Sequence, residues 1–163
     1  MDEELLEKAE AYASARGLKV ARGLGFGIHG IVVALESENE PGQTALKVHH
    51  AAEPYRRECE VYERLREASC RKILGFHVPQ FLRCDDDLLA LEMTVVTPPY
   101  VLDFAGAYLD FPPEFSDEVW ADWERKNQEQ FGAHWPMAQS ILGDLQDLGI
   151  HMHDPSPSNI RFR

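Results

Sequence analysis

A glycine-rich stretch near the N-terminus constrains the possible folds more than any other part of the sequence. Residues 25–32 read GFGIHGIV, with glycines at the first, third and sixth positions. Glycines let backbone N–H groups approach phosphate oxygens without a clash from a Cβ atom. In dinucleotide-binding folds such a stretch leads from a strand into a helix, but here the β-branched residues Ile31, Val32 and Val33 follow. The stretch therefore argues against a Rossmann fold and indicates a hairpin, either a plain glycine-rich one or one that covers phosphate.

The sequence around this hairpin predicts a small antiparallel sheet. Residues 18–37 predict two strands and QTALKVHH a third, and VPQFLRC and LLALEMTVV predict two more. A helix is expected over residues 53–68, where Pro54 suits the first turn. Its apolar stripe consists of Tyr55, Cys59, Tyr62 and Leu65. Together these patterns predict five strands with one helix inserted after the third.

Helices are also expected towards both ends of the chain. Apolar residues at helical spacing predict one over residues 3–15, with Gly17 as its C-cap. After a loop rich in proline and aromatic residues, Ser116 is a good N-cap for a helix over about residues 117–131. A last helix opens at Pro136 and ends at Gly149.

Composition narrows the class of protein. The net charge of −12 argues against a nucleic-acid binder that relies on bulk electrostatics, and it disfavours an anionic membrane surface. The three cysteines, Cys59, Cys70 and Cys84, form no CxxC pair, so neither a zinc ribbon nor a disulfide framework is indicated. Free thiols fit a reducing cytoplasm, and no apolar run approaches the ~20 residues of a membrane span. We therefore expect a cytoplasmic protein that binds neither nucleic acid nor membrane.

Two further stretches carry side chains suited to phosphate chemistry. Lys47 lies mid-strand, where its ammonium can neutralise phosphate oxygens if a carboxylate such as that of Glu58 fixes its direction. Near the C-terminus, Asp154 can accept a hydroxyl proton and Asn159 can ligate Mg²⁺ beside the phosphates of ATP. Taken alone, each stretch also fits a structure without function. Lys47 would then be an exposed strand lysine, and the stretch around Asp154 and Asn159 a loop rich in proline and serine.

In this order, the stretches resemble the protein-kinase-like superfamily, including its small-molecule kinase branches. GFGIHGIV is similar to the Gly-rich loop, TALKV to the VAIK strand, YRRECEVYERL to helix C and HMHDPSPSN to the catalytic loop. The resemblance implies an α+β fold with a kinase-like N-lobe, made of a five-stranded antiparallel sheet plus helix C. Residues 1–17 would add an N-terminal helix, residues 18–97 would form this N-lobe, and residues 98–163 a partial helical C-lobe ending at the catalytic loop.

The resemblance also implies ATP and Mg²⁺ as cofactors and a Ser/Thr or small-molecule hydroxyl as acceptor. Asp154 would be the base, Lys47 and Glu58 the ion pair that orients the phosphates, and Asn159 the metal ligand. Leu91 would be the gatekeeper residue. The nucleotide-binding residues implied are Gly25, Gly27, Gly30, Val32, Ala45, Lys47, Leu91, Glu92 and Thr94, with backbone groups near Glu92 and Thr94 facing adenine.

The sequence departs from the family pattern in and after the catalytic loop. Met152, His153 and Ser156 stand where protein kinases usually have His, Arg and Lys. A serine hydroxyl cannot reach and neutralise the transferring phosphate as a lysine does. The DFG aspartate, which holds Mg²⁺ in the family, is expected shortly after Asn159, but the sequence stops at Arg163. The resemblance therefore predicts a chain cut before the DFG motif, without that carboxylate.

This departure leaves alternatives open. The chain could be a pseudokinase that works as a binding or scaffold module without turnover. Because the later C-lobe helices are missing after Arg163, the helix at residues 137–148 would lack its usual packing partners and would expose Ile141, Leu145 or their neighbours as a docking face for a protein partner. A third reading is a metal hydrolase that uses His151, His153 and Asp154, because HMHD contains an HxH pair.

Overall fold

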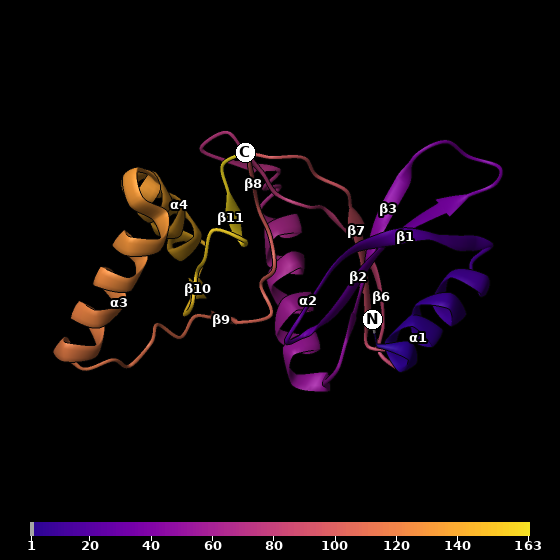
Figure 1. Ribbon diagram of the computed structural model, residues 1–163, viewed down its shortest axis with the longest axis horizontal. Helices are drawn as coiled ribbons and strands as arrows, with labels where there is room; N and C mark the ends of the chain where they lie inside the picture. The colour runs from indigo at the N-terminus through magenta and orange to yellow at the C-terminus, as the bar shows by residue number, and fades with distance from the viewer. Residues whose placement is uncertain (1) are drawn as a thin grey trace.

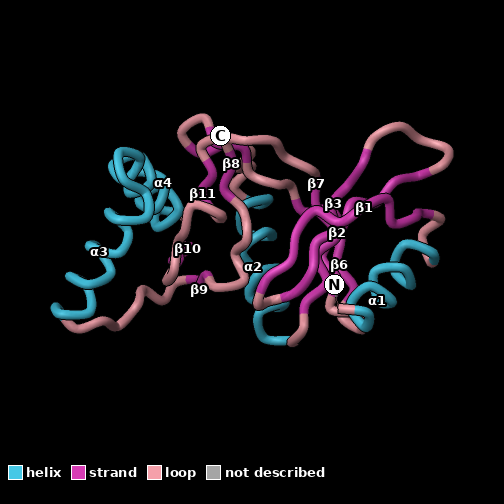
Figure 2. Tube along the Cα trace, viewed as in Figure 1, coloured by secondary structure: helices cyan, strands magenta, loops and turns pink. Residues whose placement is uncertain are grey.

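The computed structural model describes residues 2–163 and has a mixed α+β fold (Figure 1). Figure 2 shows helices at both ends of the molecule and one further helix, α2, in its middle. In chain order the elements are α1 (Glu3–Ser14), β1 (Leu18–Gly27), β2 (Gly30–Ser37), β3 (Gln43–His49), α2 (Ala52–Glu67), β4 (Lys72–Ile73), β5 (Phe76–His77), β6 (Phe81–Asp85), β7 (Ala90–Thr94), β8 (Tyr100–Val101), β9 (Ala107–Leu109), α3 (Asp117–Phe131), the 3-10 helix η1 (Gly132–His134), α4 (Trp135–Asp147), β10 (Ile150–Met152) and β11 (Ile160–Arg161).

The first half of the chain forms a five-stranded antiparallel sheet in the order β1-β2-β3-β7-β6. The prediction of five antiparallel strands with a helix after the third is confirmed. Successive side chains of a strand point to opposite faces of the sheet. Leu46 and Val48 of β3 therefore pack on one face, whereas Ala45 and Lys47 reach the other. Both faces are covered, which explains why β2, β3 and β7 are apolar along most of their length.

Helix α1 covers the first of these faces (Figure 1). The side chain of Asp2 caps it by accepting hydrogen bonds from the backbone N–H groups of Glu4 and Leu5 at 3.0 and 3.3 Å. The apolar side of α1 packs on the sheet in a core cluster that contains Leu5, Ala9, Tyr12, Ala13, Ile31, Val33, Leu35, Leu46, Val48 and Ala90. The helix predicted over residues 3–15 is therefore present and is buried along one side.

Helix α2 lies on the opposite face and stands between the sheet and the C-terminal elements (Figure 1). All four residues of its predicted apolar stripe are buried. They belong to a larger core cluster that continues through Phe104 into α4 and on to Ile150 and Ile160. The sheet and the C-terminal half thus share one continuous core with α2 inside it.

Residues 97–113, expected to be a loop, contain two short strands. β8 pairs antiparallel with β11, and β9 pairs antiparallel with β10. Strands of two or three residues are too short to show a hydrophobic period, so only the long-range pairing shows them. These pairs bring the segment that follows the sheet next to the last residues of the chain.

The expectation that α4 exposes an apolar face is corrected by the structure. Ile141 and Leu145 are fully buried, and Leu142 is nearly so. They lie in the same core cluster as Val101 of β8 and Ile160 of β11. The strands that the sequence did not reveal therefore supply the packing partners, and this part of α4 offers no docking face.

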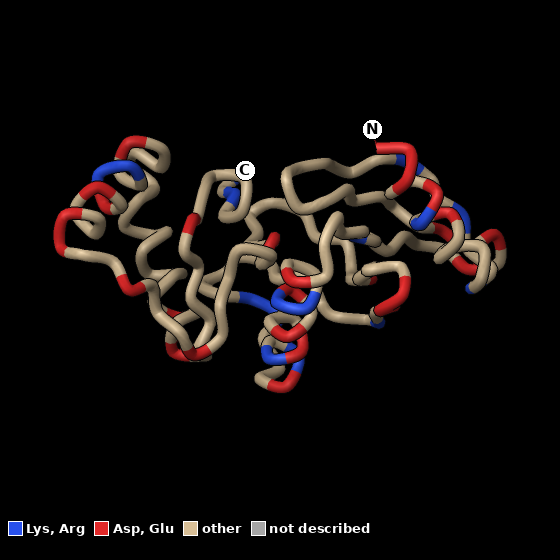
Figure 3. Tube along the Cα trace, turned by 90° about the horizontal axis from the view of Figure 1, so that it is seen from below, with Lys and Arg blue, Asp and Glu red and all other residues tan. Residues whose placement is uncertain are grey.

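Helix α3 begins and ends where the sequence predicts. Ser116 caps it, because its hydroxyl oxygen accepts a hydrogen bond from the backbone N–H of Val119 at 3.2 Å. None of the helices within residues 2–163 is long and apolar enough to cross a lipid bilayer. Figure 3 shows Asp and Glu spread over both ends and the middle of the molecule, interspersed with Lys and Arg, and the net charge of the chain is −12.

Gly30, which opens β2, has no room for a side chain. A Cβ atom at this position would lie 1.9 Å from the carbonyl oxygen of Val48, whereas one at Gly27, across the same hairpin, would meet nothing within 4 Å. We expect Gly30→Ala to lower the free energy of unfolding by at least about 1–3 kcal/mol, the usual effect of overpacking. Gly27→Ala should leave it within ~1 kcal/mol of wild type. Urea unfolding of both variants measures this, and equal stabilities would contradict the close backbone approach.

Candidate functional site

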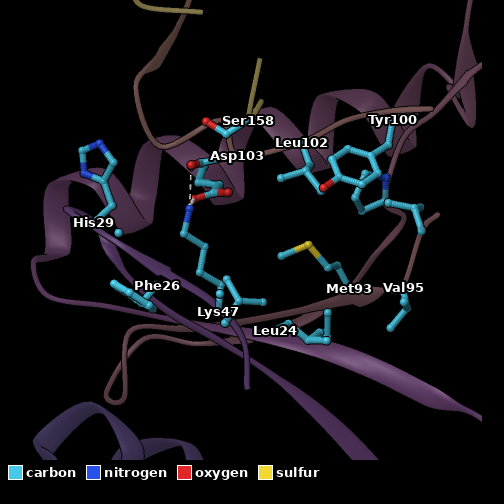
Figure 4. Close-up of a pocket in the computed structure, with 18 of the residues that line it drawn as sticks. Leu24, Phe26, His29, Lys47, Met93, Val95, Tyr100, Leu102, Asp103 and Ser158 are labelled. Atoms are coloured by element: carbon cyan, nitrogen blue, oxygen red, sulfur yellow. Dashed lines mark hydrogen bonds and ion pairs between the residues drawn. The ribbon is translucent and has the colours of Figure 1, made fainter. Parts of the chain in front are cut away.

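A cleft lies beneath the glycine-rich hairpin, between the sheet and the C-terminal half (Figure 4). Its volume is about 410 Å³. The hairpin, β3, α2, the end of β7 and the segment around β8 all contribute to its walls. The lining residues are Leu24–Gly30, Val32, Ala45, Lys47, Glu58, Tyr62, Pro79, Met93–Val96, Tyr100, Leu102, Asp103, Ser158 and Arg161.

The hairpin brings its glycines to the cleft through a tight strand-to-strand turn. Gly27 pairs with Gly30, and Ile28 and His29 form the turn between them. The backbone carbonyl of His29 accepts a hydrogen bond from His50 at 3.0 Å, which ties the turn to the end of β3. Burial and the charge of Lys47 lower the pKa of His29. The turn therefore stands over the lysine that the sequence singled out.

Most of the predicted nucleotide-binding residues line this cleft. Gly25, Gly27, Gly30, Val32, Ala45, Lys47 and Thr94 are all among its walls. Their roles in nucleotide binding stay predictions, but the structure brings them together as the resemblance implied.

Leu91 and Glu92 do not line the cleft, and this part of the prediction is corrected. Leu91 is fully buried in the core cluster shared with α2. Glu92 points to the opposite face of the sheet, where its carboxylate accepts hydrogen bonds from Tyr12 at 2.6 Å and Thr44 at 2.7 Å. Met93, two residues beyond Leu91 and on the same face of β7, reaches the cleft instead. The position predicted for Leu91 is thus occupied by Met93.

Lys47 and Glu58 form a buried ion pair at the back of the cleft. The Lys47 Nζ lies 2.8 Å from Oε2 of Glu58, and both side chains are almost fully buried. Burial alone would lower the pKa of Lys47, but the charges of Glu58 and Asp103 outweigh it and raise that pKa. Burial alone would raise the pKa of Glu58, but the charge of Lys47 and the hydrogen bond from His49 hold it at about 2. Both groups are therefore ionised at neutral pH.

A second carboxylate, which the sequence reading missed, stands beside this pair. Oδ1 of Asp103 lies 2.7 Å from the Lys47 Nζ, and Figure 4 shows the two side chains pointing at each other across the cleft. The next residue, Phe104, donates its backbone N–H to Oε1 of Glu58 at 3.3 Å. The Phe104 ring meets Tyr62 of α2 edge-on, with ring centroids 5.3 Å apart. Asp103 is thus fastened to α2 by its neighbour while its own carboxylate faces the cleft.

The strand pair β8–β11 brings the segment that carries this carboxylate next to the segment of the predicted metal ligand. The backbone N–H of Leu102 donates to the carbonyl of Asn159 at 2.9 Å. The sequence reading expected a carboxylate only after Asn159, whereas Asp103 lies on this neighbouring segment. The signal was in the sequence: residues 103–106 read DFAG. The stretch is one residue longer than DFG and precedes α3 and α4, whereas the family pattern has DFG after the catalytic loop.

Asp154 lies outside the cleft lining, at an open surface. Its side chain is 79% exposed, and its Oδ1 lies 2.8 Å from Nζ of Lys126 on α3. Asn159 is also outside the lining, although Ser158 beside it is a lining residue. The hydroxyl of Ser156, which replaces the usual lysine, donates to Oδ1 of Asn159 at 2.7 Å. The loop that the sequence predicted to be catalytic thus borders the cleft, and Lys126 supplies a cation to it from another element.

The structure does not support a zinc site at HMHD. His153 stacks on Tyr108 with ring centroids 4.2 Å apart, and Asp154 is paired with Lys126. Within residues 2–163 no three His, Cys, Asp or Glu side chains are grouped so that they could hold a metal ion. In the same range the three cysteines are free thiols.

Comparisons with known proteins return a distant likeness. No protein-family model matches the chain, and no curated protein matches it. Among solved structures, a variant of the PknI kinase domain of Mycobacterium tuberculosis is 19% identical over 81% of this chain and 48% of that chain, with a TM-score of 0.35. Another crystal structure of this kinase domain is 18% identical over 81% of this chain and 47% of that chain, with a TM-score of 0.34. The chain spans about half the length of these domains.

Protonation of Glu58 at acid pH should lower the free energy of unfolding. Because its pKa is held at about 2, below the ordinary 4.5, the ionised carboxylate contributes stability above about pH 4.5, and this contribution disappears as the pH falls towards 2. We expect Glu58→Gln to cost about 3–5 kcal/mol at pH 7, and the gap to wild type to narrow below pH 4.5.

Denaturant unfolding between pH 7 and pH 2 measures the gap. The control is Glu53→Gln on the same helix, whose side chain is 80% exposed. A gap between Glu58→Gln and wild type that stays constant with pH would contradict the ionised, buried carboxylate.

Proposed function

We propose that the chain binds ATP with Mg²⁺ in the cleft and belongs by function to the kinase-like phosphotransferases. The observation that carries this proposal is the setting of Lys47: a buried lysine, directed by Glu58, beside a second carboxylate and under a glycine-rich hairpin. A lysine so placed supplies a fixed positive charge where polyphosphate oxygens need one. The backbone N–H groups of the hairpin supply further donors to the same phosphates.

The residues present fit a magnesium ion. Mg²⁺ prefers oxygen ligands and is usually held by one or two carboxylates together with substrate phosphates. Asp103 would hold the ion, because it offers a carboxylate that is 40% exposed and faces the cleft. Asn159, the predicted ligand, would join it only if its amide oxygen, which accepts from Ser156 outside the cleft lining, turned towards Asp103. When bound, Mg²⁺ would neutralise charge that develops on the transferred phosphoryl group.

In this proposal each protein group has a separate task. Lys47 binds phosphate oxygens, Glu58 keeps the ammonium directed into the cleft, and Asp154 orients the acceptor hydroxyl and takes its proton. Lys126 is the cation nearest to Asp154 in the described structure, at 2.8 Å. It stands in for the positive charge that Ser156 cannot provide. Adenine would lie against Ala45, Met93 and the backbone of residues 94–96.

Loss of the Lys47 ammonium should weaken ATP binding. We expect Lys47→Met to weaken the affinity for Mg·ATP by about 10–100-fold, because a hydrogen bond to a charged group contributes about 1.5–3 kcal/mol. Isothermal titration calorimetry measures the affinity. Lys19→Met is the matched control, since Lys19 lies on β1 and pairs with Glu36 at 3.3 Å, away from the cleft lining. Equal affinities for wild type and Lys47→Met would exclude the assigned site.

Asp103 should carry the dependence of ATP binding on Mg²⁺. We expect Mg²⁺ to strengthen ATP binding by wild type but not by Asp103→Asn, with a difference of at least about tenfold. Removal of a residue that only orients a metal ligand typically lowers metal affinity 10–100-fold, and we take the lower end of that range. Titrations with Mg²⁺ and with EDTA give the two affinities. The control is Asp87→Asn at the exposed turn before β7, and an unchanged response to Mg²⁺ in Asp103→Asn would refute the assignment.

A catalytically inactive binding module is the second candidate. It is favoured by the serine at position 156, where the resemblance implies a lysine, and by the exposed position of Asp154 outside the cleft lining. Transfer of label from radioactive ATP to peptides and small hydroxyl compounds separates the two candidates. Transfer by wild type and by Asp122→Asn, but not by Asp154→Asn, would establish the phosphotransferase. Binding of ATP without transfer to any acceptor would favour the inactive module.

A further inference from the structure

His49 is a buried histidine next to the candidate site. It lies two residues beyond Lys47 on β3, so both side chains leave the same face of the strand towards α2. Its side chain is 0% exposed, and it is absent from the lining of the cleft. Nucleotide binding as proposed above therefore gives it no contact of its own.

Both ring nitrogens of His49 face hydrogen-bond acceptors. Nε2 lies 2.8 Å from Oε2 of Glu58, and Nδ1 lies 3.2 Å from the backbone carbonyl oxygen of Leu89. A neutral imidazole has one N–H and can donate to only one of these oxygens, whereas an imidazolium donates to both. Glu58 cannot donate in return, because its pKa is held at about 2 and its carboxylate is ionised.

The other groups around His49 do not replace its contact with Glu58. Lys47 is the one other cation in contact with Glu58 in the described structure, and it faces Asp103 as well. Tyr55 of α2, the titratable group whose ring packs edge-on against His49 at 5.5 Å, donates its hydroxyl to Asp86 at 2.7 Å and supplies no charge to the cluster. Without a cation at His49, the buried carboxylate of Glu58 would therefore depend on a lysine that it shares with the 40% exposed Asp103.

We propose that His49 is a positioning residue: as an imidazolium it holds Glu58, and with it α2, independently of Lys47. Oε2 of Glu58 accepts from both Lys47 and His49, and Oε1 accepts from the backbone N–H of Phe104. If Lys47 turns towards nucleotide phosphates, a step that rests on the proposed function, Glu58 keeps a cation and stays ionised. Helix α2 then stays docked on the sheet both with and without nucleotide.

The protonation of the ring can be observed directly. Ring nitrogens of ¹⁵N-labelled protein are recorded by NMR at pH 7.5 without nucleotide, and His49→Gln identifies the signals that belong to His49. We expect two N–H signals with imidazolium shifts for His49 in wild type, and their loss in Glu58→Gln. One N–H on a neutral His49 ring in wild type would overturn the proposal. This measurement needs no nucleotide, so it is independent of whether the chain binds ATP.

The positioning role is tested on α2 itself. We expect His49→Gln to speed amide hydrogen exchange around Glu58 at least about tenfold, a change that corresponds to ~1.4 kcal/mol. His49→Lys, which restores a cation, should recover much of the protection. His50→Gln is the matched control, because the neighbouring His50 has a side chain that is 43% exposed and pairs loosely with Asp2 at 3.7 Å. Unchanged exchange in His49→Gln, or equal exchange in the Gln and Lys variants, would overturn the role.

Titration of Mg·ATP into the same three variants separates this proposal from the proposed function. With ATP binding in wild type, His49→Gln should bind about 3–10-fold more weakly than wild type and His50→Gln equally well, a difference of ~0.7–1.4 kcal/mol. Unaltered affinity in His49→Gln would overturn the link to the nucleotide site. If wild type shows the imidazolium and the α2 protection but no ATP binding, the proposed function fails, and the role of His49 in holding Glu58 stands.

Discussion

The buried carboxylate of Glu58 is the group on which the rest of the structure depends. An isolated charge in a protein interior is costly, so it persists only where partners surround it. Here three partners come from two separate parts of the chain: Lys47 and His49 from β3, and the backbone N–H of Phe104 from the segment after β8. One side chain of helix α2 therefore contacts both the sheet and the segment that follows it. A displacement of either part would leave this charge short of a partner.

The outer surface of α2 strengthens the same connection. Arg57 donates to the backbone carbonyl of Ala105 at 3.1 Å, and Arg64 donates to Asp110 at 2.7 Å. Both acceptors belong to the segment that contains β9. Exposed pairs of this kind contribute little alone, but they act on the segment that Phe104 already anchors in the core. Asp103 is thereby held at the cleft by contacts on either side of it, although its own carboxylate is partly exposed.

Local patterns predicted the parts of the fold that depend on local physics. The helical spacing of Leu5, Ala9 and Tyr12 indicated α1, the Ser116 cap indicated α3, and the change from helical spacing to β-branched runs indicated the sheet. The sequence was less successful in predicting which residues of β7 reach the cleft. A motif match put Leu91 at the cleft, but strand alternation and the end of the sheet place Met93 there and turn Glu92 towards Tyr12. The partners of Glu92 come from three elements, with Tyr12 on α1, Thr44 on β3 and Arg83 on β6, and no local pattern records how these elements come together.

The position of Asp103 shows a different limit of prediction from sequence. The residues DFAG were recognisable, but they come before the predicted catalytic loop and not after it, so they were overlooked. A motif search along the chain expects the second carboxylate after the catalytic loop, because it reads the motifs in sequence. The contacts of Asp103 require only that its segment pair with the strand that follows Asn159. Since β8 and β11 are antiparallel neighbours, that segment can precede the two helices as well as follow the loop. The second carboxylate of the cleft thus comes from the segment between β8 and β9, which follows the five-stranded sheet. Spatial pairing, rather than the order of motifs, decides which side chains meet at Lys47.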